Sequence, residues 1–111
     1  MRDPMTSDGS NYGAANNRLQ RALAEGNLER AISASKELPR VGLREAARML
    51  HLMARDRSPL FDKAAARWIS RFAVEIRGVT AEQMAEVAGA VADLPDMNAA
   101  ETLLAATRRS S

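Results

Sequence analysis

Cysteine is absent from the sequence of 111 residues, and histidine occurs once, as His51. Disulfide bonds and thiolate metal ligands are therefore excluded, and one chain cannot form a metal site with two histidines. No apolar run approaches the roughly 18 residues that span a bilayer, so we expect no membrane partner. The polar N-terminal segment lacks the apolar core of a secretory signal, which makes a cytoplasmic location the expected one.

Aromatic residues are also scarce, at 4% of the chain, whereas alanine, leucine, arginine and glutamate are abundant. These four abundant types lose little conformational freedom in a helix. The hydrophobic fraction of 46% and the charged fraction of 27% are those of an ordinary soluble protein of single-domain length. We therefore predict an all-α fold, a compact bundle or stack of about five or six antiparallel helices that resemble α-hairpin repeats.

Helix boundaries are marked by residues that cap or interrupt a helix. The predicted stops are glycines, which adopt positive φ without penalty, or prolines, which cannot continue a helix. They are Gly26, Pro39, Gly78 and Pro95. The predicted N-terminal caps carry a side-chain oxygen that accepts a free backbone N–H. They are Asn27, Ser58, Thr80 with Gln83, and Asn98 with Glu101. These boundaries predict one helical domain at 14–107, between a disordered polar tail at 1–13 and a frayed C-terminus at 108–111.

The helix predicted between Ser58 and Gly78 forms the centre of the core, because it contains the only tryptophan and both phenylalanines. At about 100° per residue, its apolar side chains share one arc and its cationic side chains lie on the opposite arc. The apolar arc consists of Phe61, Ala65, Trp68, Ile69, Phe72 and Ile76. We therefore predict a buried Trp68 and an exposed basic face.

An internal repeat relates two of the predicted helices. Residues 28–39 and 84–95 match at apolar positions and both end in an acidic residue, leucine and proline, at an offset of 56 residues. A repeat of this kind predicts stacked α-hairpins.

Two resemblances over short segments also indicate a helical fold. The segment Leu-Ala-Glu-Gly-Asn-Leu-Glu-Arg-Ala at 23–31 resembles the inter-helix turn of tetratricopeptide-type repeats, although the 34-residue period is absent. The segments Glu-Leu-Pro-Arg at 37–40, Ala-Arg-Met-Leu at 47–50 and Ala-Arg-Trp-Ile-Ser-Arg-Phe at 66–72 resemble short, alanine- and arginine-rich helical proteins of high-GC actinomycetes. That group has no assigned function, so the resemblance implies a helical fold and a bacterial cytoplasmic setting but no activity.

Charge is distributed unevenly along the chain, although the formal net charge is only +2. Residues 40–77 contain nine lysines and arginines against four acidic residues. Residues 78–107 contain five acidic residues and no lysine or arginine. Such a distribution can steer an acidic partner to the middle of the chain, or one copy of the protein to another.

No catalytic, cofactor-binding or metal-binding residue is predicted. His51 lies between two leucines and is interpreted as structural. Glu82 and Glu86 could together hold a hard cation, but no further oxygen ligands converge in the sequence, so a solvated acidic face is the preferred interpretation. Four methionines at helical spacing could line a groove for a partner helix, and core packing is preferred for them. They are Met49, Met53, Met84 and Met97.

We therefore predict a non-enzymatic helical module that binds a partner protein or self-associates through surfaces of opposite charge. The predicted basic contact residues are Arg44, Arg48, Lys63, Arg67 and Arg71. The predicted acidic contact residues are Glu82, Glu86 and Asp93. The alternative is a small nucleic-acid-associated protein whose basic face binds the phosphate backbone, because arginines four residues apart can follow a line of phosphates. Lys63, Arg67 and Arg71 have this spacing, and so do Arg40, Arg44 and Arg48.

Overall fold

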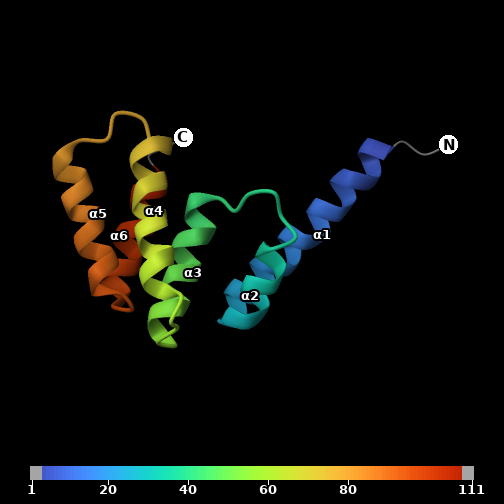
Figure 1. Ribbon diagram of the computed structural model, residues 1–111, viewed down its shortest axis with the longest axis horizontal. Coiled ribbons are helices and arrows are strands. Elements are labelled where there is room, and N and C mark those ends of the chain that lie inside the picture. The colour runs from blue at the N-terminus through green and yellow to red at the C-terminus, as the bar shows by residue number, and fades with distance from the viewer. Residues whose placement is uncertain (1–3, 109–111) are drawn as a thin grey trace. The chain divides into compact units, whose positions relative to one another are not determined.

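The computed structural model describes the backbone of residues 4–108 and the side chains of residues 12–108. Within these ranges all regular structure is helical and no strand occurs, which confirms the all-α prediction. The helices are α1 (Pro4–Glu25), α2 (Leu28–Ser35), α3 (Leu43–Arg55), α4 (Phe61–Glu75), α5 (Ala81–Asp93) and α6 (Met97–Arg108), as Figure 1 shows. They form two compact units that divide between Val41 and Gly42, which we call the N-terminal unit and the C-terminal unit. The predicted single domain at 14–107 stays a prediction.

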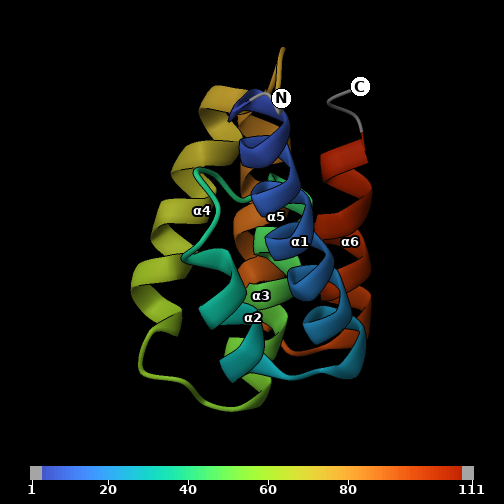
Figure 2. The same ribbon diagram turned by 90° about the vertical axis from the view of Figure 1, so that its right-hand side faces the viewer.

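The N-terminal unit is a hairpin of α1 and α2, which lie side by side in Figure 2. The predicted turn is confirmed, because Gly26 has a φ of 70° and the Asn27 side chain accepts the backbone N–H of Arg30 at 3.0 Å. The core of the hairpin consists of Ala15, Leu19, Ala22, Leu23, Ala31 and Ala34. Small residues on α2 allow the two helices to pack closely.

Both helices of this hairpin differ in extent from the prediction. α1 begins at Pro4 rather than at Ala14, so it includes most of the segment predicted to be a disordered tail, while residues 1–3 lie outside the described part of the chain. Proline suits the first turn of a helix, and adding residues to a formed helix is cheaper than starting a new one. α2 ends at Ser35, four residues before the predicted stop at Pro39, because proline has no N–H for the carbonyl of Ser35 and disfavours helical geometry at the residue before it.

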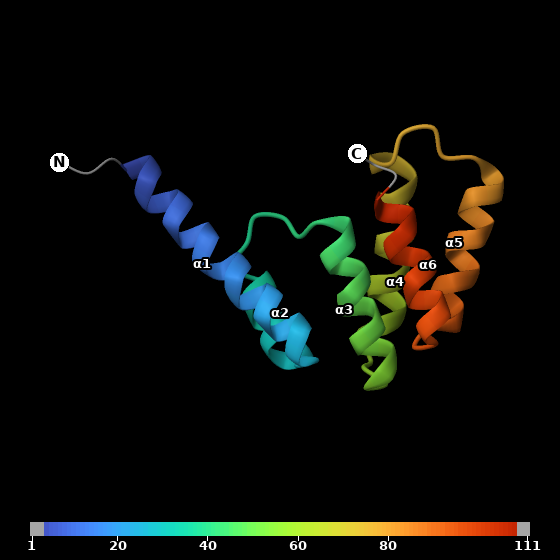
Figure 3. The same ribbon diagram turned by 180° about the vertical axis from the view of Figure 1, so that it is seen from behind.

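The C-terminal unit is a bundle of four helices. α3 packs against α4 and α6, and α5 also packs against α4 and α6, so the described helices close into a ring (Figure 3). Successive helices run in opposite directions, as short connections require. Contact between α3 and α6 distinguishes this arrangement from an open stack of hairpins, in which each hairpin would meet only its neighbours.

The centre of this bundle is Trp68, whose exposed fraction is 1%. Its indole N–H donates a hydrogen bond of 2.9 Å to the carbonyl oxygen of Leu43, which joins α4 to the first turn of α3. The Phe72 ring stacks on the indole with a centroid distance of 5.4 Å. The predicted burial of the tryptophan is therefore confirmed.

The predicted cap of α5 is confirmed and that of α6 is wrong. The Thr80 hydroxyl accepts the Gln83 backbone N–H at 3.1 Å, and the Gln83 side chain accepts the Thr80 backbone N–H at 2.9 Å. At α6 the cap is Asp96, whose carboxylate accepts the Ala99 backbone N–H at 3.1 Å, rather than Asn98. The two positions offer equivalent side-chain oxygens, and α6 begins one residue before Asn98, which leaves that side chain inside the helix.

The turn after α3 contains a residue with left-handed backbone geometry that is not glycine. Arg57 has a φ of 54°, and the next residue, Ser58, donates its backbone N–H to the carbonyl of Met53 at 2.8 Å. The Ser58 hydroxyl then accepts the backbone N–H of Leu60 at 3.1 Å in a turn that precedes α4. The predicted cap at Ser58 is therefore wrong, because this turn delays the start of α4 to Phe61, where Leu60 precedes the helix and no side chain caps it.

Candidate functional site

The outward face of α4 carries a row of side chains that we call the α4 stripe: Lys63, Arg67, Ser70 and Val74, all exposed. Val74, in the last turn of α4, is exposed to 85%, a high degree for an apolar side chain. Neither Lys63 nor Arg67 forms a hydrogen bond or ion pair with another described side chain. The stripe therefore combines unneutralised positive charge with an exposed apolar group.

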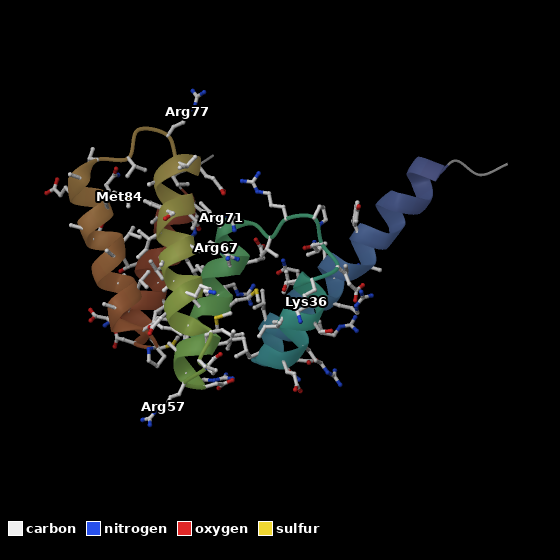
Figure 4. All side chains as sticks on the ribbon, viewed as in Figure 1. Lys36, Arg57, Arg67, Arg71, Arg77 and Met84 are labelled. Carbon is white, nitrogen blue, oxygen red and sulfur yellow. The ribbon has the colours of Figure 1, made fainter. Side chains whose placement is uncertain are left out.

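Arg71, which the sequence grouped with Lys63 and Arg67, does not belong to this stripe. Its Nε donates to a carboxylate oxygen of Glu75 at 2.7 Å, and each of the two side chains is 25% exposed. A step of four residues rotates a helix position by about 40°, so Arg71 lies about 80° away from Lys63. Figure 4 labels Arg67 and Arg71 on α4, and Arg77 just beyond its end, where it extends away from the bundle. Arg71 is thus part of an internal ion pair.

The predicted row of arginines at 40, 44 and 48 is not a continuous helix face. Arg40 precedes α3 and belongs to the N-terminal unit, so only Arg44 and Arg48 lie on the helix. Arg44 is exposed and Arg48 is half-buried with interactions of its own. Of the five predicted basic contact residues, three retain an exposed guanidinium or ammonium group that is not engaged by another described residue. They are Arg44, Lys63 and Arg67.

The predicted acidic residues lie on α5, where Glu82, Glu86 and Asp93 are all exposed. Glu86 and Asp93 line an open hollow of about 340 Å³ between α5 and α6, which we call the α5–α6 groove. Asp96 adds a third carboxylate to its lining, and Gly89 leaves open space on the α5 side, since an added Cβ there would meet nothing within 4 Å. The groove is therefore negatively charged and unobstructed at its centre.

The exposed ion pair of Arg55 and Asp56 changes the pKa of both residues, although neither residue belongs to the α4 stripe or to the α5–α6 groove. Arg55 Nε donates a hydrogen bond of 2.8 Å to a carboxylate oxygen of Asp56 at the end of α3. This bond lowers the pKa of Asp56 and raises the pKa of Arg55, and their Coulombic attraction acts in the same direction. Both groups are solvated, so the pair has no feature of a buried catalytic site.

His51 is half-buried in α3. Met49 and Met53 are buried, in line with a core role, whereas Met84 (labelled in Figure 4) is half-buried and Met97 is 63% exposed. No group of three or more histidine or acidic side chains that could hold a metal ion occurs among the described residues. None of the helices in the described part of the chain is long and apolar enough to cross a membrane.

Sequence reasoning missed two elements of these surfaces. Val74 could have been found, because it lies about 20° from Lys63 on a helical wheel. The meeting of Asp96 with Glu86 and Asp93 needed the packing of α6 against α5, which no local pattern encodes.

Comparison of the chain with protein-family models, with curated proteins and with solved structures gives no match.

Proposed function

We propose that this protein is a non-enzymatic helical interaction module that self-associates head-to-tail. The α4 stripe of one copy lies against the α5–α6 groove of the next. The observation that carries the proposal is that one small bundle holds exposed charges of both signs that are not neutralised within it. Lys63 and Arg67 have no partner among the described side chains, and the same is true of Glu86 and Asp93.

Complementary charge steers association and fixes which faces meet, while the affinity comes from groups that lose water at the centre of the contact. Val74 supplies such a group at the C-terminal end of the stripe, because most of its surface is in water. Gly89 supplies the matching space, since a residue without a side chain allows close approach of another element. The contact thus combines the charges of Lys63 and Arg67 at one end of the stripe with the apolar Val74 at the other.

Two different faces meet in this contact, so it is heterologous. A heterologous contact generates a closed ring or an open filament rather than a two-fold dimer. Attraction between exposed charges is screened beyond about 8 Å at physiological ionic strength, so assembly should weaken as salt is added.

Charge-reversed variants test the pairing of faces. K63E/R67E makes the stripe acidic, and E86K/D93K makes the groove basic. Light scattering over a concentration series at low salt should show oligomers for the wild type and monomers for each variant alone. A mixture of the two variants should associate again, because every stripe then meets a groove of opposite charge. The control K36E/R40E changes the net charge as much as K63E/R67E does but leaves both faces intact, so it should assemble as the wild type does.

A steric variant separates specific docking from general electrostatic attraction. G89L fills the groove without changing any charge, and leucine is a good helix former, so the bundle should remain folded. It should be monomeric where the wild type associates. A wild-type protein that stays monomeric at high micromolar concentration and low salt would contradict the proposal.

A second candidate function rests on the unpaired cations Arg44, Lys63 and Arg67, which could contact a phosphate backbone. In that case the logarithm of the affinity for duplex DNA should fall linearly with the logarithm of the salt concentration, by about 0.9 per phosphate contacted. Fluorescence anisotropy with a labelled duplex measures this slope. Absence of binding at low salt would remove the candidate.

A further inference from the structure

The N-terminal unit contains a hollow of about 250 Å³ between α1 and α2 that none of the surfaces above uses. Two buried alanines, Ala22 and Ala34, line it where the helices approach each other. The long side chains of Arg18, Arg21 and Glu25 from α1 and of Arg30 from α2 surround it, together with the short hydroxyl side chain of Ser33. Small residues at the helix contact and long ones around it explain why a hollow forms there.

Positive charge predominates around this hollow. Arg18 forms an ion pair with Glu37, which neutralises one guanidinium. The guanidinium groups of Arg21 and Arg30 form no hydrogen bond or ion pair with another described residue, although both line the same small volume. Glu25 is the only acidic residue of the lining. Two unneutralised cations that share a hollow repel each other, and an anion between them would relieve that repulsion.

The size of the hollow restricts the class of ligand. Pockets for drug-sized organic molecules measure about 300–1,000 Å³, and this hollow is smaller. A water molecule occupies about 30 Å³ of liquid, so there is room for a small oxyanion with some of its water. The planar guanidinium group presents two parallel N–H donors that match the oxygens of a phosphate group.

We propose that this hollow binds a phosphate group, as the free ion or as a small phosphate monoester. Arg21 and Arg30 donate hydrogen bonds to the phosphate oxygens from opposite helices, and the Ser33 hydroxyl donates a further one. Glu25 repels the ligand and lowers its affinity. The site is separate from the surfaces proposed for self-association, so either proposal can fail without the other.

Titration of the ¹⁵N-labelled full-length protein with inorganic phosphate tests the site, with ionic strength held constant by sodium chloride. The backbone amide of Ser33 and the Nε–H signals of Arg21 and Arg30 should shift together and reach saturation. R21Q and R30Q should each weaken binding about tenfold, the usual effect of losing a hydrogen bond to a charged group. E25Q should bind more tightly than the wild type, because the repelling charge is gone.

The matched control is K36Q/R40Q, which removes two positive charges from the same unit outside the hollow and should leave the affinity unchanged. Glycerol 3-phosphate distinguishes the two sources of the ligand. Equal affinity for it and for inorganic phosphate identifies the phosphate group alone as the ligand, and tighter binding identifies a monoester. The proposal is overturned if chloride alone produces the same shifts, if R21Q/R30Q binds as the wild type does, or if K36Q/R40Q weakens binding equally.

Discussion

Replacement of the central tryptophan by phenylalanine, Trp68→Phe, should destabilise the C-terminal unit by about 3 kcal/mol. The lost hydrogen bond to the Leu43 carbonyl contributes about 1 kcal/mol, since that carbonyl can still accept the helical bond of α3. Two buried ring carbons contribute about 0.8 kcal/mol each, because Trp68 is 1% exposed. A residual void of roughly 30 Å³ at about 24 cal/mol per Å³ adds about 0.7 kcal/mol.

Urea unfolding followed by circular dichroism at 222 nm measures this loss as a lower midpoint with an unchanged slope. Tyr12, in α1, becomes the only strong fluorophore of the variant, so its emission reports on the N-terminal unit separately. Val74→Ala on the same helix is the matched control and should change stability by less than about 0.5 kcal/mol, because that side chain is exposed. A loss below about 1 kcal/mol for Trp68→Phe would refute the central role given to the indole.

Three further substitutions test local features. Arg57→Gly should stabilise the protein by about 1 kcal/mol, seen as a higher urea midpoint, because glycine tolerates the φ of 54° at the end of α3. Thr80→Ala should cost about 1 kcal/mol in the same assay, since it removes the cap of α5. Arg55→Ala should raise the pKa of Asp56 toward its ordinary value in a carboxyl NMR titration. Because the native pKa of Asp56 is lowered, any stability that this pair contributes is present at neutral pH and is lost as the pH falls through that pKa. An unchanged pKa of Asp56 in the Arg55→Ala variant would exclude the pairing.

Local chemistry explains why most helix boundaries could be predicted. Gly26 and Gly78 both adopt positive φ, and Asn27 and Thr80 both cap the helices that follow them. Each of these features depends on a few neighbouring residues, so the sequence contains all the information needed. The errors occurred where two adjacent residues offered the same chemistry, as with the cap of α6, or where helix propagation extended a boundary, as at Pro4.

The candidate surfaces were predictable only in part. The sequence shows which outward residues are basic on α4 and which are acidic on α5. Helical geometry alone would also have replaced Arg71 by Val74 in the α4 stripe. The pairing of Arg71 with Glu75 could also have been predicted, because the two residues are four apart on one helix. The arginines of the N-terminal hollow come together across the turn at Gly26, so no linear pattern marks them.

The sequence by itself determined the helical class, the caps at Asn27 and Thr80 and the burial of Trp68, because periodicity and capping act over a few residues. Only the tertiary structure decided that α3 meets α6 to close a ring, that Asp96 joins Glu86 in one groove and that Arg21 faces the same hollow as Arg30. These juxtapositions arise from the packing of whole helices, whose relative placement depends on all of their contacts at once and not on any single segment.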